Sequence, residues 1–75
     1  MNEPSVLTVN HLTPRQLEVL RAYAETGSMK IAAHQLGLSP ATVRATLVNI
    51  RARLGVGSSV QAVMLVFGPT GQSSV

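Results

Sequence analysis

Residues 38–54, LSPATVRATLVNIRARL, decide the fold, because they predict one helix with a clear start and two chemically different faces. Ser39 is a good N-cap, and Pro40 at the first helical position has no N–H group that would need a partner. The helix is therefore expected over about residues 40–54. At about 100° per residue, its apolar stripe consists of Val43, Leu47, Ile50 and Leu54. The opposite face carries Ala41, Arg44, Ala45, Val48 and Arg51.

The segment upstream predicts a first helix over about residues 13–26. Thr13 is an N-cap, Pro14 follows it, and Gln16 completes a capping box. Gly27 ends the helix. The side chains expected on its buried side are Leu17, Leu20 and Ala24, flanked by Val19 and Tyr23.

A second, short helix is predicted over about residues 28–36, MKIAAHQL with its cap. It is apolar around most of its circumference, which predicts a place in the middle of a small bundle. Gly37 ends it and leads through a tight turn into the helix at residues 40–54. Short helix, glycine-containing turn and longer capped helix together form a helix-turn-helix pattern.

A fourth helix is predicted over about residues 58–67. Ser58 and Gln61 form another capping box, and Gly68 with Pro69 stops the helix. Its main apolar stripe is expected to consist of Val60, Val63, Met64 and Phe67. Leu65 and Val66 lie outside this stripe and are also apolar, so the helix has more apolar surface than one core contact requires.

The predicted architecture is all-α, with four helices in one domain over residues 12–67. Residues 1–11 show no helical periodicity and are expected to form a flexible arm. Residues 68–75, GPTGQSSV, have the composition of a disordered tail.

Composition restricts the classes of function. The chain of 75 residues has no cysteine, which excludes disulfides and thiolate–metal sites, and it carries six basic against three acidic residues. This surplus of +3 favours an anionic partner. No run of about 18 apolar residues and no signal-peptide pattern occurs, so we expect no membrane partner and a cytoplasmic location.

The residue types that catalysis or metal binding needs are scarce. The acids are Glu3, Glu18 and Glu25, the histidines His11 and His34 lack metal-ligand spacing, and no glycine-rich phosphate loop occurs. His34 is interpreted as a surface residue. We therefore expect no enzymatic activity, no cofactor, no metal and no small-molecule ligand.

The outer face of the helix at residues 40–54 predicts contact with DNA. Arg44, one turn into an electropositive helix N-terminus, is placed for a bidentate contact to guanine O6 and N7 in the major groove. Ala45 and Val48 are small and apolar, which suits thymine methyl groups. Residues expected to reach phosphates or flanking base edges are Ser39, Thr42, Thr46, Asn49, Arg51 and Arg53. Taken singly, each arginine is better explained as a solvated helix position, and the helix-turn-helix context favours DNA.

Four motifs, LTPRQLEVL, KIAAHQLGLSPATVR, NIRARLGV and SSVQAV, together resemble the LuxR/GerE-type DNA-binding domain over about residues 12–67. The resemblance implies a bacterial transcription regulator whose third helix enters the major groove and whose fourth helix forms a homodimer. By position it implies base-facing roles for Arg44, Ala45 and Val48, with Thr42 and Thr46 near phosphates. Members of the family usually carry a receiver or ligand-binding domain upstream. Because only about eleven residues precede the first helix, we expect a stand-alone domain.

Two functions from different classes stay open at this point. The first is a sequence-specific regulator that binds double-stranded DNA as a homodimer through Ala62, Leu65 and Val66 of the fourth helix. The second is a protein-interaction module on the same scaffold, which binds RNA polymerase, a sigma factor or another regulator through its apolar surface. A relation to sigma-factor region 4 would also mean DNA binding, as a part of the polymerase.

Overall fold

The computed structural model describes residues 12–68, and within this range the chain forms four helices and no strand. The helices are α2 (Pro14–Thr26), α3 (Met29–Leu36), α4 (Pro40–Leu54) and α5 (Ser59–Val66). The predicted all-α architecture of four helices is confirmed. The predicted arm at 1–11 and nearly all of the predicted tail lie outside the described residues.

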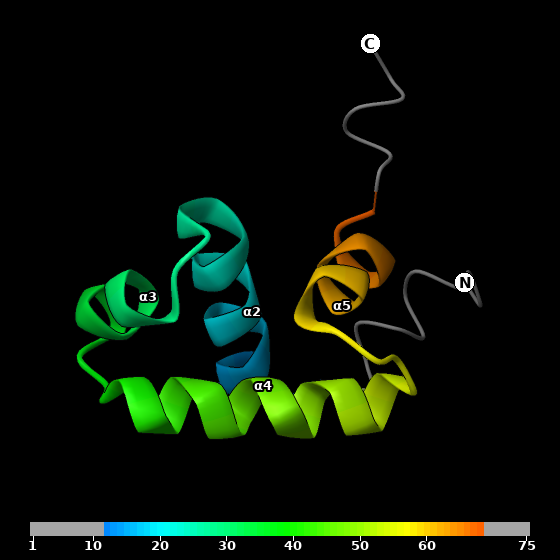
Figure 1. The fold of residues 1–75 in the computed structure, drawn as a ribbon, viewed down its shortest axis with the longest axis horizontal. Helices are drawn as coiled ribbons and strands as arrows, with labels where there is room; N and C mark the ends of the chain where they lie inside the picture. Colours follow the sequence, from blue (N-terminus) through cyan, green and yellow to red (C-terminus); the bar gives the residue numbers. More distant parts are fainter. Residues whose placement is uncertain (1–11, 69–75) are drawn as a thin grey trace, which may run out of the picture.

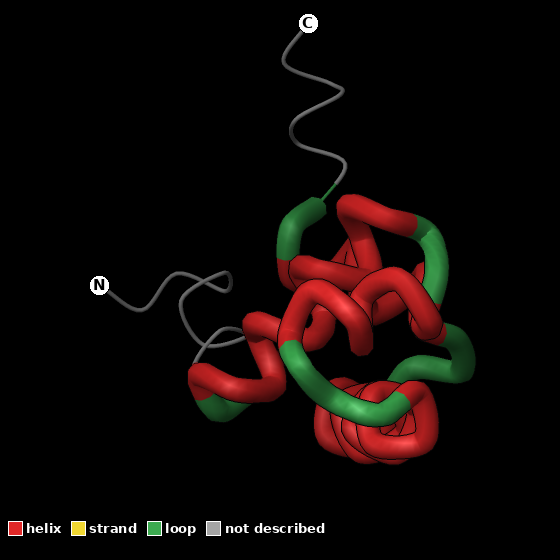
Figure 2. Tube along the Cα trace, turned by 90° about the vertical axis from the view of Figure 1, so that its left-hand side faces the viewer, coloured by secondary structure: helices red, strands yellow, loops and turns green. Residues whose placement is uncertain are grey.

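Helix α4 is the longest element, and the other three helices lie on one side of it (Figure 1). Figure 2 views α4 along its axis and shows the same one-sided arrangement. Helix α2 contacts α3, α4 and α5, and helix α4 contacts α2, α3 and α5. One long side of α4 is therefore left uncovered.

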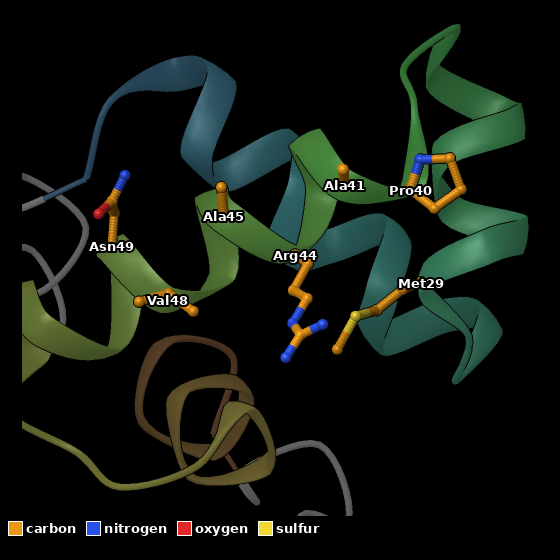
Figure 3. A pocket seen from close by; sticks show the side chains of 7 residues that line it. All are labelled: Met29, Pro40, Ala41, Arg44, Ala45, Val48 and Asn49. Atoms are coloured by element: carbon orange, nitrogen blue, oxygen red, sulfur yellow. The ribbon is translucent and has the colours of Figure 1, made fainter.

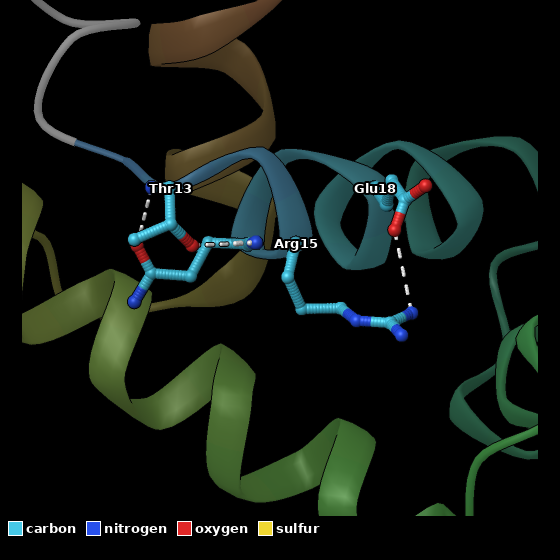
Figure 4. Close-up of polar contacts among 4 residues, drawn as sticks. Thr13, Arg15 and Glu18 are labelled. Atoms are coloured by element: carbon cyan, nitrogen blue, oxygen red, sulfur yellow. Dashed lines mark hydrogen bonds and ion pairs between the residues drawn. The ribbon is translucent and has the colours of Figure 1, made fainter.

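Hydrogen-bonded caps set where the helices begin. Thr13 Oγ1 accepts a hydrogen bond from the Gln16 N–H at 3.0 Å, and Gln16 Oε1 accepts one from the Thr13 N–H at 2.9 Å (Figure 4). This is the predicted capping box. Ser39 Oγ accepts a hydrogen bond from the Thr42 N–H at 3.1 Å, and Pro40 occupies the first position of α4. Helix α4 therefore has its predicted bounds.

The start of α5 differs from the prediction in one detail. Ser58 Oγ accepts a hydrogen bond from the Gln61 N–H at 3.1 Å as expected. The Gln61 side chain, however, accepts its hydrogen bond from the Gly57 N–H at 2.8 Å and not from Ser58. The helix spans Ser59–Val66, one residue shorter at each end than predicted.

The turn between α3 and α4 depends on Gly37. Its φ of 69° and ψ of 31° lie in the left-handed region, and its N–H donates to carbonyl groups in the last turn of α3. No atom lies within 4 Å of the position that a Cβ would take. Glycine is therefore required here by backbone conformation and not by lack of space.

The hydrophobic core lies where α2, α3 and α5 pack against the inner side of α4. Val43, Leu47 and Ile50 are completely buried, and Leu54 is half-buried. The predicted apolar stripe of α4 is thus confirmed. Leu20 of α2 and Ala62 of α5 are completely buried against it.

Two predictions about packing in the first half of the chain are wrong. Ala24 is exposed and Ala22 is buried, because α2 contacts three helices and its buried arc turns away from Ala24. Helix α3 is not in the middle of the bundle: it buries only Ala32 and Ala33, and Ile31 is 50% exposed. Helix α2 takes the central position instead.

The predicted apolar stripe of α5 is also wrong in part. Val60 and Met64 are 59% and 50% exposed, whereas Ser59 and Ala62 are buried and Val66 packs against the core. Because α5 is apolar around most of its circumference, its periodicity does not select a face. In the structure, α5 turns Ala62 toward the core, and Ser59 accepts a hydrogen bond from Arg51 of α4.

Candidate nucleic-acid interface

The uncovered side of α4 brings the predicted base-facing residues together. Arg44 and Ala45 are exposed, and Val48 is 45% exposed. All three project from a helix whose opposite side is anchored by the completely buried Leu47 and Ile50. Core packing on one side therefore presents these residues to solvent on the other.

An open hollow of about 680 Å³ lies along this surface. We call it the α4 hollow, and it is lined by Met29 of α3 together with Pro40, Ala41, Arg44, Ala45, Val48 and Asn49 of α4 (Figure 3). Figure 3 shows the Arg44 side chain extending beside that of Met29. Arg44 is the charged residue of this lining, Asn49 is its neutral polar residue, and the others are apolar.

Arg44 differs from other arginines of the described chain in having no internal partner. Within residues 12–68 it forms no hydrogen bond or ion pair, whereas Arg15 Nη1 lies 3.3 Å from Glu18 Oε1 (Figure 4). The Arg21 Cζ atom lies 5.1 Å from the centre of the Phe67 ring. The guanidinium group of Arg44 therefore keeps its five donors for an external acceptor.

The hydroxyl residues expected near phosphates form an edge at the start of α4. Ser39 and Thr42 are exposed, and their hydroxyl oxygens are hydrogen-bonded to each other at 2.9 Å. Thr46 is half-buried, and its hydroxyl donates to the Thr42 carbonyl oxygen at 2.8 Å. Asn49 is exposed farther along the helix. These interactions hold the hydroxyl groups in place within the helix and leave oxygen lone pairs and solvent access at Ser39 and Thr42.

Arg51 has a structural partner that the sequence pattern did not indicate. It is half-buried, and its Nη1 donates to Ser59 Oγ at 3.1 Å, which joins α4 to the first turn of α5. Ser59 is the buried polar residue of the described chain, so the bond also provides its hydroxyl with a partner. Arg53, two residues on, is exposed.

Charge is distributed unevenly over the helices. Helices α3 and α4 carry four basic residues and no acidic one; the basic residues are Lys30, Arg44, Arg51 and Arg53. Helix α2 carries two arginines and two glutamates, and α5 carries no charged residue. The positive charge of the described chain is thus concentrated on the helix-turn-helix, where it favours a polyanion.

The other exposed apolar surface lies on α5. Val60, Met64 and Leu65 are 59%, 50% and 47% exposed, and we call them the α5 patch. Of the residues predicted for a dimer contact, only Leu65 belongs to it. Ala62 has no exposed surface and Val66 packs against the core, so neither offers its side chain for association in this conformation. The small side chain of Ala62 instead lets α5 approach the core closely.

Met29 is the residue of this surface that lies outside α4, and the sequence pattern does not indicate it. It stands in the first turn of a helix that is apolar nearly all round, so no periodicity distinguishes it from core residues. In the structure it is half-buried and lines the α4 hollow. Across residues 12–68, no three His, Cys, Asp or Glu side chains lie together where they could hold a metal ion.

Comparison with known proteins places the chain in a family. The model for bacterial regulatory proteins of the luxR family matches residues 10–66, which include all four described helices. Searches of curated proteins and of solved structures gave no significant match. Among the described helices, none combines the length and the apolar character needed to cross a membrane. The chain therefore belongs to the luxR family of bacterial regulatory proteins, and its helix-turn-helix is a DNA-binding domain of a transcription regulator and not an enzyme.

Proposed function

We propose that the domain binds double-stranded DNA sequence-specifically by placing α4 in the major groove, with Arg44 facing a guanine. The observation that carries this proposal is the exposed guanidinium of Arg44, which has no internal partner and extends from the uncovered side of α4. An arginine that faces the major groove can donate two hydrogen bonds to guanine O6 and N7. The small side chains of Ala41 and Ala45 let the helix axis come close to the base edges.

Residues at the edge of α4 have the chemistry to hold the helix in register on the phosphate backbone. Ser39 and Thr42 offer hydroxyl groups at the electropositive helix start, and Thr46 offers one in the second turn. Asn49 and Arg53 extend the edge toward the other end. Arg51 contributes charge while it also holds Ser59. As a bacterial DNA-binding regulator, the protein is expected to act in the cytoplasm, where the chromosome lies.

The exposed apolar α5 patch supports a homodimer. Its three large apolar side chains lie on a helix without any charge, and such surfaces are typical of association sites. A two-fold dimer through α5 would place two copies of α4 on two half-sites of a palindromic operator.

The role of Arg44 is tested by the substitution Arg44→Ala. We expect a loss of about 1–3 kcal/mol in binding to a selected operator and relaxed preference at one base pair, because the bidentate contact is lost. Gel shifts at two salt concentrations and footprinting measure both effects. Arg15→Ala is the matched control: it removes the same charge from α2, where Arg15 pairs with Glu18, and should leave the sequence preference intact. An unchanged footprint and preference in Arg44→Ala would show that another surface recognises the bases.

The dimer contact is tested by Leu65→Glu. A carboxylate in the α5 patch should yield a folded monomer at micromolar concentration, because burying an unpaired charge in an apolar contact is unfavourable. Sedimentation velocity measures the mass and circular dichroism checks the fold. Ile31→Glu on α3, a residue of similar exposure outside the patch, should remain dimeric. A Leu65→Glu protein that still sediments as a dimer would rule out this interface.

The same α5 patch supports the second candidate, a protein-interaction module that binds RNA polymerase or another regulator. This alternative predicts a monomeric wild-type protein without sequence-selective DNA binding, and loss of the partner contact in Leu65→Glu. Saturable, salt-sensitive and sequence-selective binding by a dimer would decide for the first candidate.

A further inference from the structure

The α4 hollow presents more apolar surface than a contact between one arginine and one guanine requires. Besides Arg44 and Asn49, every lining residue is apolar, and Val48 is 45% exposed there. No carboxylate lines the hollow, although carboxylates are the usual acceptors for the N4 amino group of cytosine. Apart from Arg44 and Asn49, the lining therefore suits a hydrocarbon group on a base edge.

Charge complementarity favours duplex DNA as the occupant of the hollow. The two helices that line it, α3 and α4, carry four basic residues and no acidic one. The α5 patch is also apolar and exposed, but its helix has no charge at all. A purely apolar protein segment would leave the Arg44 guanidinium in the lining without an acceptor, whereas the major groove offers apolar groups and hydrogen-bond acceptors between two rows of phosphates.

We propose that the α4 hollow recognises the C5 methyl group of a thymine close to the guanine that Arg44 binds. Val48 is its main apolar contact, and Met29 closes the side toward α3 (Figure 3). Thymine is the one standard base that presents a methyl group in the major groove. This inference rests on the proposed function and adds the chemical group that the apolar residues recognise.

The spacing of the two side chains limits where this thymine lies. Val48 follows Arg44 by four residues, which corresponds to about 6 Å along a helix axis. Successive base pairs are about 3.4 Å apart along each strand. The thymine is therefore expected within two base pairs of the guanine. Burial of one methyl group corresponds to a change in affinity of roughly fourfold.

The test replaces thymine by deoxyuridine, which lacks only the methyl group. A duplex is first selected from a random-sequence library with the wild-type protein, and the guanine is located as the position whose preference Arg44→Ala relaxes. Each thymine of that duplex is then replaced singly, and dissociation constants are measured by fluorescence anisotropy. We expect a weakening of roughly fourfold for a thymine within two base pairs of the guanine and less than twofold elsewhere.

Val48→Ala assigns the effect to the hollow. Because Val48 is exposed, this variant should fold normally, as circular dichroism will check, and deoxyuridine should no longer weaken its binding. Val60→Ala is the matched control: it is the same substitution at an exposed position of α5, and it should keep the roughly fourfold effect whatever it does to overall affinity.

Three results would overturn the inference while Arg44-dependent, sequence-selective binding persists. One is a selected site without thymine near the guanine. Another is a change below twofold for every deoxyuridine replacement. The third is an undiminished deoxyuridine effect in Val48→Ala, which would place the methyl contact elsewhere. Absence of any sequence-selective duplex binding would instead overturn the proposed function, and this inference with it.

Discussion

Both faces of α4 carry apolar residues, yet one face packs into the core and the other faces solvent. On the inner face Val43, Leu47 and Ile50 are completely buried, while on the outer face Ala45 and Val48 are exposed. Apolar character therefore does not separate the faces. The faces differ in whether other helices cover them. Helices α2, α3 and α5 all lie on the inner side, and the outer side presents small apolar groups around Arg44, which has no internal partner.

This difference assigns stability to the inner face and recognition to the outer one. The inner side chains are branched and large enough to fill the space between three helices. The outer ones, Ala45 and Val48, are no larger than valine, which suits a helix that must approach another surface closely. Substitutions that change stability without changing DNA binding, or the reverse, test this assignment.

The largest effect is expected for Leu47→Ala on the inner face. Removing a completely buried leucine leaves a cavity, so the free energy of unfolding should fall by about 2–5 kcal/mol. That is a large share of the roughly 5–15 kcal/mol typical of small domains. Urea unfolding followed by circular dichroism, at equal protein concentrations because association stabilises the folded state, measures the loss.

Val48→Ala is the matched control, because it truncates the neighbouring residue on the outer face. It should change the free energy of unfolding by no more than about 0.5 kcal/mol. A comparable loss of stability in the two variants would mean that the outer face is packed in solution, and the division of α4 into two faces would be wrong.

The bounds of the helices could be predicted because their signals are local. Thr13 with Gln16, Ser39 with Pro40, and Gly37 each act within about four residues, and the hydrogen bonds and left-handed backbone they require are present. The exposed grouping of Arg44 with its small neighbours was likewise predictable, since it follows from the opposite position of a regular apolar stripe.

Packing among the helices could not be predicted to the same extent. In α5 nearly every position is apolar, so sequence spacing could not show that Ala62 is buried while Met64 is exposed. Helix α3 poses the same problem, which is why Met29 was missed as part of the hollow. The bond from Arg51 to Ser59 depends on how the chain turns between α4 and α5, and no local pattern encodes it.

That bond provides the next test, because Arg51 belongs to both functions of α4. Arg51→Ala should lower the free energy of unfolding by about 1–2 kcal/mol through loss of the bond to Ser59. It should also weaken binding to all DNA sequences and flatten the salt dependence. Ser59→Ala removes the same bond but keeps the charge, so it should destabilise the fold and leave the salt dependence unchanged.

Chemical unfolding and the slope of log affinity against log salt concentration separate the two contributions of Arg51. If Arg51→Ala and Ser59→Ala have equal salt slopes, Arg51 acts through α5 alone and its charge does not reach the phosphates. If Arg51→Ala alone flattens the slope, one side chain supports both the fold and the DNA contact.

The smallest effect on stability is expected at Ser39, the N-cap of α4. Ser39→Ala removes the cap on the Thr42 N–H and should cost about 1 kcal/mol of stability. Ser39→Asp keeps a capping oxygen and adds a negative charge that suits the helix start, so stability should be retained. That carboxylate would face the phosphates, however, and should weaken DNA binding more than Ser39→Ala does. Measured together, unfolding and anisotropy should rank the two variants in opposite orders, and a common order would show that the start of α4 stays clear of the DNA backbone.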